Sequence, residues 1–127
     1  MNLEKVVFGF FIVFALTLNF SFFLGEYDNP AHHNVLQLSL VVLINLITTV
    51  LKLGDRSQIG AVLLATSLVA DLQLLGASFY WMYAVYITEL GLTPYIMASI
   101  VSLSGGALIA NIISVVILVS ETLMSRL

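Results

Sequence analysis

The stretch ATSLVADLQLLGAS, residues 65–78, places a carboxylate and an amide near the middle of a long apolar segment. An aspartate at the centre of a bilayer costs about 2.5–3.5 kcal/mol on insertion scales. A chain tolerates Asp71 there only if the side chain faces protein or water, is neutral, or has a partner. The rest of the sequence is therefore analysed as the surroundings of this residue.

The composition predicts an all-α integral membrane protein. Of the 127 residues, 61% are hydrophobic and only 9% are charged, whereas soluble domains carry about 25% charged residues. A net charge of −3 with four basic residues argues against nucleic-acid binding. The absence of cysteine excludes disulfides, thiolate nucleophiles and cysteine-based metal sites.

Four apolar segments are long enough to cross a membrane, and together they predict one four-helix domain over residues 1–127. The expected helices cover approximately residues 4–24, 34–52, 57–87 and 94–122. Asp28-Asn29-Pro30 is a turn signal, and Thr93 followed by Pro94 is typical of a helix start. We expect the first segment to be a retained helix and not a secretory signal, because it is long and an acidic loop follows it.

The charge distribution predicts the orientation. With four spans, all basic residues fall on one side and the loops on the other side carry only acidic charges; the residues are Lys5, Lys52, Arg56 and Arg126 against Glu26, Asp28 and Glu89. The positive-inside rule then predicts antiparallel neighbouring helices with both termini in the cytoplasm, in the plasma (inner) membrane. The same bias argues against dual topology, so any homo-oligomer should be parallel.

A layer of polar side chains is expected near the membrane midplane. It contains Asn45, Asp71, Gln73 and Asn111, from three different helices. Amides at such positions usually hydrogen-bond between helices, each contributing about 0.6 kcal/mol. An intramembrane carboxylate, in contrast, is a functional-site hypothesis by default. We therefore predict an ion- or proton-binding site with Asp71 at its centre and supporting oxygens from Asn45, Asn111, Ser67 and Thr48.

The counter-charge of Asp71 is not evident from the sequence. Lys52 is the nearest basic candidate, and its position at the end of a span predicts that it lies at the cytoplasmic interface. The partner of Asp71 would then be a proton, a permeating cation or a residue of another polypeptide. A neutral, purely structural acid is the remaining alternative.

Two further groups of residues have simpler interpretations. Small residues recur every four positions in the last helix and predict close helix packing, to which the amide of Gln73 would contribute; they are Ser102, Gly106, Ala110 and Ser114. The first outer loop carries Glu26, Asp28, His32 and His33, which predict an acidic vestibule that concentrates cations. A metal site there is less favoured, because adjacent histidines usually point in different directions.

No catalytic motif and no cofactor-binding pattern occurs, so we expect no enzymatic activity. The preferred hypothesis is a parallel homo-oligomeric channel or transporter subunit that moves a cation or protons. The alternative is a non-catalytic accessory or assembly subunit of a larger membrane complex. In both cases the lipid bilayer is an expected partner.

Overall fold

The structure is a computed structural model that describes residues 2–125. Arg126, counted above among the basic residues, lies outside the described residues. The helices are α1 (Leu3–Phe23), α2 (Val35–Lys52), α3 (Gln58–Tyr86) and α4 (Pro94–Met124), with a short 3-10 helix at Pro30–His32. The prediction of an all-helical chain is confirmed, and all four helices are long and apolar enough to cross a membrane.

Each long helix begins at a residue whose side chain accepts a hydrogen bond from a free backbone N–H of the first turn. These capping residues are Asn2, Asn34, Ser57 and Thr93. Such caps satisfy donors that have no partner within the helix. They explain why the helices start where they do.

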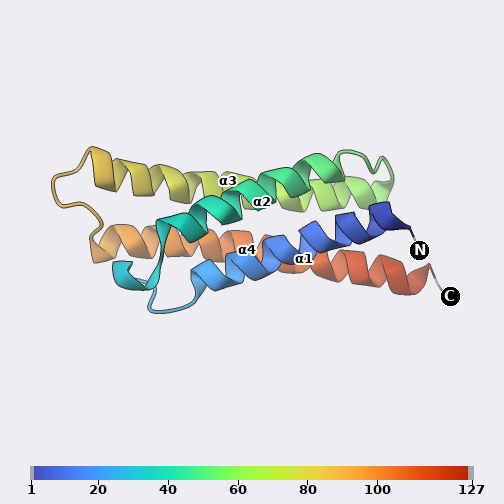
Figure 1. The fold of residues 1–127 in the computed structure, drawn as a ribbon, viewed down its shortest axis with the longest axis horizontal. Helices are drawn as coiled ribbons and strands as arrows, with labels where there is room; N and C mark the ends of the chain where they lie inside the picture. The colour runs from blue at the N-terminus through green and yellow to red at the C-terminus, as the bar shows by residue number, and fades with distance from the viewer. Residues whose placement is uncertain (1, 126–127) are drawn as a thin grey trace.

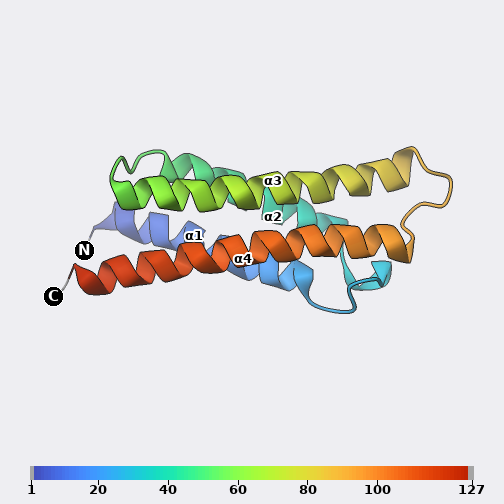
Figure 2. The same ribbon diagram turned by 180° about the vertical axis from the view of Figure 1, so that it is seen from behind.

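The four helices form a bundle in which α1 packs against α2, α2 against α3, α3 against α4 and α4 against α1. Both chain termini and the α2–α3 connection lie at one end of the bundle, which we call the terminal end (Figure 1). The other two connections lie at the opposite end, the loop end, as the view from behind also shows (Figure 2).

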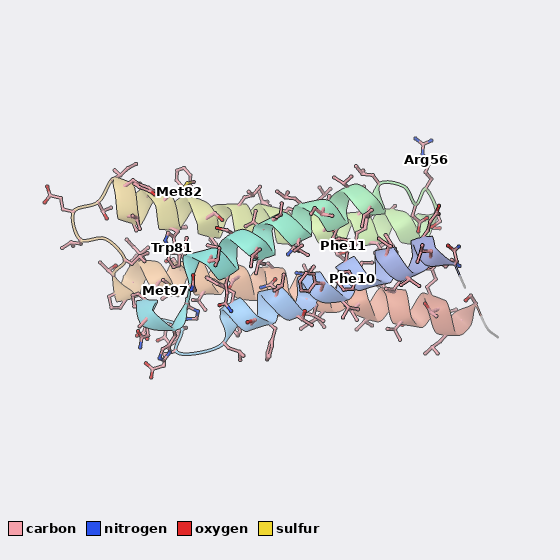
Figure 3. All side chains as sticks on the ribbon, in the orientation of Figure 1. Phe10, Phe11, Arg56, Trp81, Met82 and Met97 are labelled. Carbon is pink, nitrogen blue, oxygen red and sulfur yellow. The ribbon has the colours of Figure 1, made fainter. Side chains whose placement is uncertain are left out.

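A hydrophobic core fills much of the loop-end half, together with the buried polar side chains of Asn19 and Ser104. Phe22 and Leu38 are buried there against Trp81, Met97 and Ile100. Figure 3 shows Trp81 and Met97 in this half of the bundle. The packed side chains close the loop end of the bundle interior.

Large apolar side chains also cover the outside of the bundle. Phe10, Val50 and Leu72 are exposed by 57%, 65% and 74%. An apolar exterior of this extent is unfavourable in water and matches the hydrocarbon of a bilayer. The fold therefore encloses buried polar side chains inside an apolar exterior.

Candidate functional site

The centre of the polar interior is a buried acid and a buried base. Asp71 on α3 is 8% exposed and Lys52 at the end of α2 is 1% exposed. When both groups are ionised, their opposite charges attract each other. No hydrogen bond joins the two groups: Asp71 contacts Thr49, and Lys52 donates to Thr66 and Ser114.

Lys52 is the last residue of α2, yet its side chain is buried inside the bundle. Its Nζ atom donates to Ser114 Oγ at 2.7 Å and to Thr66 Oγ1 at 3.5 Å. Ser114 lies ten residues before the end of α4 at Met124, which is about 15 Å along the helix. Side chains on a helix tilt toward its N-terminus, so a lysine at the C-terminal end of α2 points back into the bundle.

Asp71 thus has a positively charged neighbour within its own chain. The sequence-based search for its counter-charge had turned to a proton, a free cation or another polypeptide. With Lys52 inside the same bundle, a foreign cationic residue is not required. The Oδ1 atom of Asp71 is nevertheless buried and accepts no hydrogen bond from any residue between 2 and 125.

Thr49 connects Asp71 to the backbone of α2. Its Oγ1 lies within hydrogen-bond distance of Asp71 Oδ2 and at 2.8 Å from the carbonyl oxygen of Asn45. A hydroxyl has one proton and can donate it to only one of these oxygens at a time. If Thr49 donates to the Asn45 carbonyl, its contact with Asp71 is a hydrogen bond only when the carboxyl is protonated and donates. The two hydrogen-bond arrangements of Thr49 therefore match two protonation states of Asp71.

Three asparagines form a network next to this pair. Asn111 Nδ2 lies 3.0 Å from Asn19 Oδ1 and 3.1 Å from Asn45 Oδ1. Asn19 in turn donates to the carbonyl of Ser104 at 2.9 Å, and Asn45 donates to the carbonyl of Val41 at 2.7 Å. The network joins α1, α2 and α4 within one chain. It includes Asn19, which we had not assigned to the site.

The other predicted supporting residues lie in the interior but do not contact Asp71 through hydrogen bonds. Thr48 is buried, and its Oγ1 donates to the carbonyl of Ile44 at 2.7 Å and lies 3.2 Å from that of Phe11. Ser67 is buried one turn before Asp71 on α3. Thr49 and Lys52 take the places around Asp71 instead. Both lie on the same face of α2 as Asn45. This shared face is the sequence feature that could have predicted them as neighbours of Asp71.

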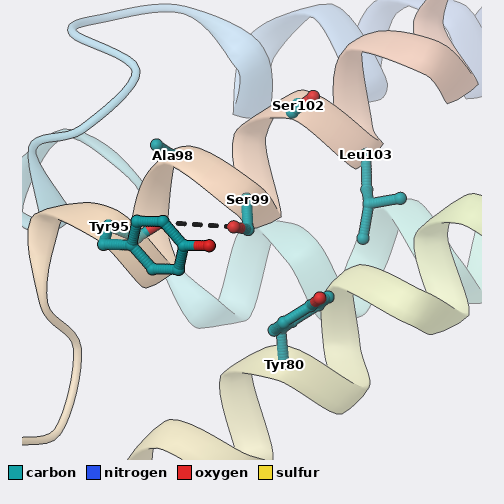
Figure 4. A pocket seen from close by; sticks show the side chains of 6 residues that line it. All are labelled: Tyr80, Tyr95, Ala98, Ser99, Ser102 and Leu103. Carbon is teal, nitrogen blue, oxygen red and sulfur yellow. Dashed lines mark hydrogen bonds between the residues drawn. The ribbon is translucent and has the colours of Figure 1, made fainter.

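The stripe of small residues on α4 is divided between several environments. Gly106 leaves room for the amide of Gln73, since a Cβ atom at this position would overlap the amide. Ala110 is buried in the core and Ser114 binds Lys52. Ser102 is exposed and lines a shallow hollow of about 340 Å³ with Tyr80, Tyr95 and Ser99 (Figure 4). The stripe is therefore not one continuous packing surface inside the bundle.

The acidic outer loop does not gather its four predicted residues around one space. Glu26 and His32 are exposed and Asp28 is half-buried, whereas His33 is 4% exposed. Both ring nitrogens of His33 face backbone carbonyls. Within residues 2–125, no group of three histidine, aspartate or glutamate side chains has the arrangement of a metal site.

A model for a family of unknown function (DUF6394) matches residues 32–122. The chain belongs to this family. The DUF6394 match covers more than half of the sequence, from the outer loop to the last turns of α4, and it includes His33, Thr49, Lys52 and Asp71. No curated protein and no solved structure matches the chain.

Proposed function

We propose that this DUF6394 protein is a membrane transport subunit in which Asp71 binds and releases a proton. The observation that carries the proposal is the buried pair of Asp71 and Lys52, in which one carboxylate oxygen lacks a hydrogen bond within residues 2–125. Charged groups inside a membrane are costly and mark ion or proton pathways. A purely structural contact between helices would not need them.

A proton is favoured over a metal cation by the position of Lys52. Its ammonium group lies in the same interior as Asp71 and repels any bare cation that approaches the carboxylate. A proton, in contrast, is accommodated by a change in a single hydrogen bond. Thr49 donates to Asp71 when the carboxylate is charged and to the Asn45 carbonyl when the carboxyl is protonated.

The proposed transport unit is a parallel homo-oligomer. A hydrophobic core fills much of the loop-end half of a single bundle. We therefore propose that the part of the proton pathway that passes the loop-end half lies between neighbouring subunits. We propose antiparallel neighbouring helices, cytoplasmic termini and a location in the plasma (inner) membrane, because Lys5 and Arg56 lie at the terminal end while the acidic loops lie at the loop end.

Purified protein in liposomes with an internal pH-sensitive dye tests the proposed function. We expect proton flux from the wild type, loss of flux in Asp71→Asn and partial retention in Asp71→Glu, which keeps a carboxylate. Ser78→Ala is the matched control, because it removes a hydroxyl from the same helix that only donates to the carbonyl of Leu74. Flux is compared per amount of folded, inserted protein. Normal flux in Asp71→Asn would refute the proposal.

Orientation and assembly are tested separately. The chain has no cysteine, so single cysteines introduced at Asp28 or Gly91 should react with an impermeant reagent on intact cells, and those at Ser57 or Ser125 should not. Equal labelling of both sets would contradict a single orientation. Co-purification of stoichiometric foreign subunits in mild detergent would favour the accessory-subunit alternative over a homo-oligomer.

A further inference from the structure

The hydrocarbon layer of a bilayer does not cover the whole length of α3 and α4. Lys5, Arg56 and Glu121 lie at the terminal end of the bundle and place the boundary of the hydrocarbon there, because charged side chains on the outside of a bundle avoid it. A layer of about 30 Å corresponds to roughly 20 residues of helix. The opposite boundary then lies just after the end of α1, near Gly76 on α3 and near Val101 on α4.

Contacts between the helices show that these positions lie at one level. A Cβ atom at Gly76 would lie 3.4 Å from the side chain of Leu103, and one at Gly105 would lie 2.9 Å from Phe23 in the last turn of α1. The last turns of α3 and the first turns of α4 extend past α1 as a helical hairpin (Figures 1 and 2). Each arm is about 15 Å long, whereas the headgroup layer is about 5–8 Å thick on each side of a bilayer. The hairpin therefore passes through the headgroup layer at the loop end.

The exposed side chains of this hairpin suit a headgroup layer. Tyr80, Tyr83, Tyr86 and Tyr95 are each exposed by 44% or more, and neither arm contains a charged residue. A tyrosine side chain has an apolar ring and a polar hydroxyl, and it is enriched where hydrocarbon meets water. The surface of the hairpin thus offers hydroxyl groups to lipid headgroups.

The shallow hollow between the two arms gathers some of these hydroxyls at the level of the boundary. It is lined by Tyr80, Tyr95, Ser99, Ser102 and Leu103 (Figure 4). The hydroxyl of Ser99 donates to the carbonyl of Tyr95 at 3.2 Å, which is the one side-chain hydrogen bond among the lining residues. The hydroxyls of Tyr80, Tyr95 and Ser102 can therefore donate to a ligand. Leu103 extends the hollow toward the hydrocarbon.

We propose that this hollow binds the headgroup of a zwitterionic phospholipid from the leaflet at the loop end. The oxygens of the phosphate group are strong hydrogen-bond acceptors, and the hydroxyls of Tyr80, Tyr95 and Ser102 donate to them. The acyl chains lie on Leu103 and on the apolar exterior below it. The site is independent of the proposed proton transport, because it lies outside the bundle interior.

The charges at the loop end favour a zwitterionic headgroup over an anionic one. Within residues 2–125, the hairpin and both loop-end connections contain no lysine or arginine. The connections carry Glu26, Asp28 and Glu89, which repel a lipid of net negative charge and attract an ammonium group. The exposed face of the Tyr95 ring can also bind an ammonium group. Choline and ethanolamine headgroups share this chemistry.

Lipid titration of the full chain in dodecyl maltoside, a detergent with a sugar headgroup, tests the site. Thermal unfolding is followed as dioleoyl phosphatidylcholine is added, and the half-saturating lipid concentration is measured. The wild type should be stabilised in a saturable way. Tyr80→Phe/Ser102→Ala removes two hydroxyls and should raise the half-saturating concentration about tenfold. Tyr86→Phe removes an exposed hydroxyl outside the hollow, so it is the matched control and should titrate as the wild type does.

Two lipids with the same acyl chains identify the headgroup chemistry. Dioleoylglycerol lacks the phosphate and dioleoyl phosphatidylglycerol lacks the ammonium group, so neither should give a stabilisation that the double variant loses. Inorganic phosphate should not stabilise the protein. The proposal is overturned if the double variant binds phosphatidylcholine as the wild type does, or if either of the other lipids or phosphate alone reproduces the hydroxyl-dependent effect. Ser102→Ala by itself, a change at an exposed position, gives the same comparison if the double variant does not fold.

Discussion

In the loop-end half of the bundle the helices meet through Phe22, Leu38 and Met97, whereas in the terminal half they meet through Lys52, Asp71 and Asn111. The two interiors differ in the ionisable groups that they contain. The hydrophobic core of the loop-end half contains no ionisable side chain, and the buried His33 lies at its outer end. The polar half contains two buried ionisable groups, Asp71 and Lys52. The hydroxyl of Thr49 lies within hydrogen-bond distance of both the Asp71 carboxylate and the Asn45 carbonyl, so it can donate to either. The loop-end core packs the helices without buried charge, whereas the terminal half contains the groups on which the proposed proton binding depends.

The largest effect is expected from removing one member of the buried charge pair. Lys52→Met leaves Asp71 without its positive neighbour and should destabilise the protein by about 3–5 kcal/mol. The double variant Lys52→Met/Asp71→Asn should regain much of this loss, because no uncompensated charge remains. Lys5→Met, on the exposed end of α1, is the control. If the stability loss of the double variant equals the sum of the losses in Lys52→Met and Asp71→Asn, the two groups are not coupled.

A cavity in the apolar half should separate stability from transport. Ile100 is fully buried in the loop-end core, and Ile100→Ala should cost about 2–5 kcal/mol of stability through lost packing. Proton flux per folded protein should remain near the wild-type value, because no polar group is touched. Thermal unfolding in detergent and the liposome assay measure the two quantities. Loss of flux at unchanged stability would contradict the division of the bundle into two halves.

The asparagine network should contribute less than either of these changes. Asn111→Leu removes the donor shared by Asn19 and Asn45 and should cost about 1–2 kcal/mol. Flux should fall only partly, because Asp71, Thr49 and Lys52 remain. The same two assays check this variant. If this variant loses proton flux as completely as Asp71→Asn, the amides are as important for transport as the carboxylate.

The smallest effect is expected at the α2–α3 connection, outside the interior. Ser57→Ala removes the cap of α3 and should cost about 1 kcal/mol. Hydrogen bonds from the side chain and backbone of Ser57 also hold the pKa of Asp55 below its ordinary value of 3.8. A lowered carboxyl pKa stabilises the fold above that ordinary value, and the contribution is lost as the pH falls below it. Unfolding measured between pH 3 and pH 7 should therefore show a smaller acid sensitivity in the variant.

Gln73 shows what a helical wheel alone can and cannot define. Gln73 lies on the side of α3 opposite Asp71, and the sequence predicts that its amide contributes to helix packing. In the structure its amide lies over Gly106 of α4, within the same chain. The spacing of residues defines which side of a helix a group occupies, but not which helix lies beside that side. The rest of the predicted site, including the binding role of Asp71 and its supporting oxygens, stays a prediction.

The sequence by itself determined that four helices are long and apolar enough to cross a membrane, and that a carboxylate lies in the middle of the third. Hydrocarbon leaves no partner for an open backbone, so helix length and apolarity can be read from residue order alone. Only the tertiary structure decided that Lys52 turns inward toward Asp71, that Thr49 binds this carboxylate, and that His33 caps α1. Those contacts depend on the rotation of each helix and the direction of each Cβ bond, which packing in three dimensions sets.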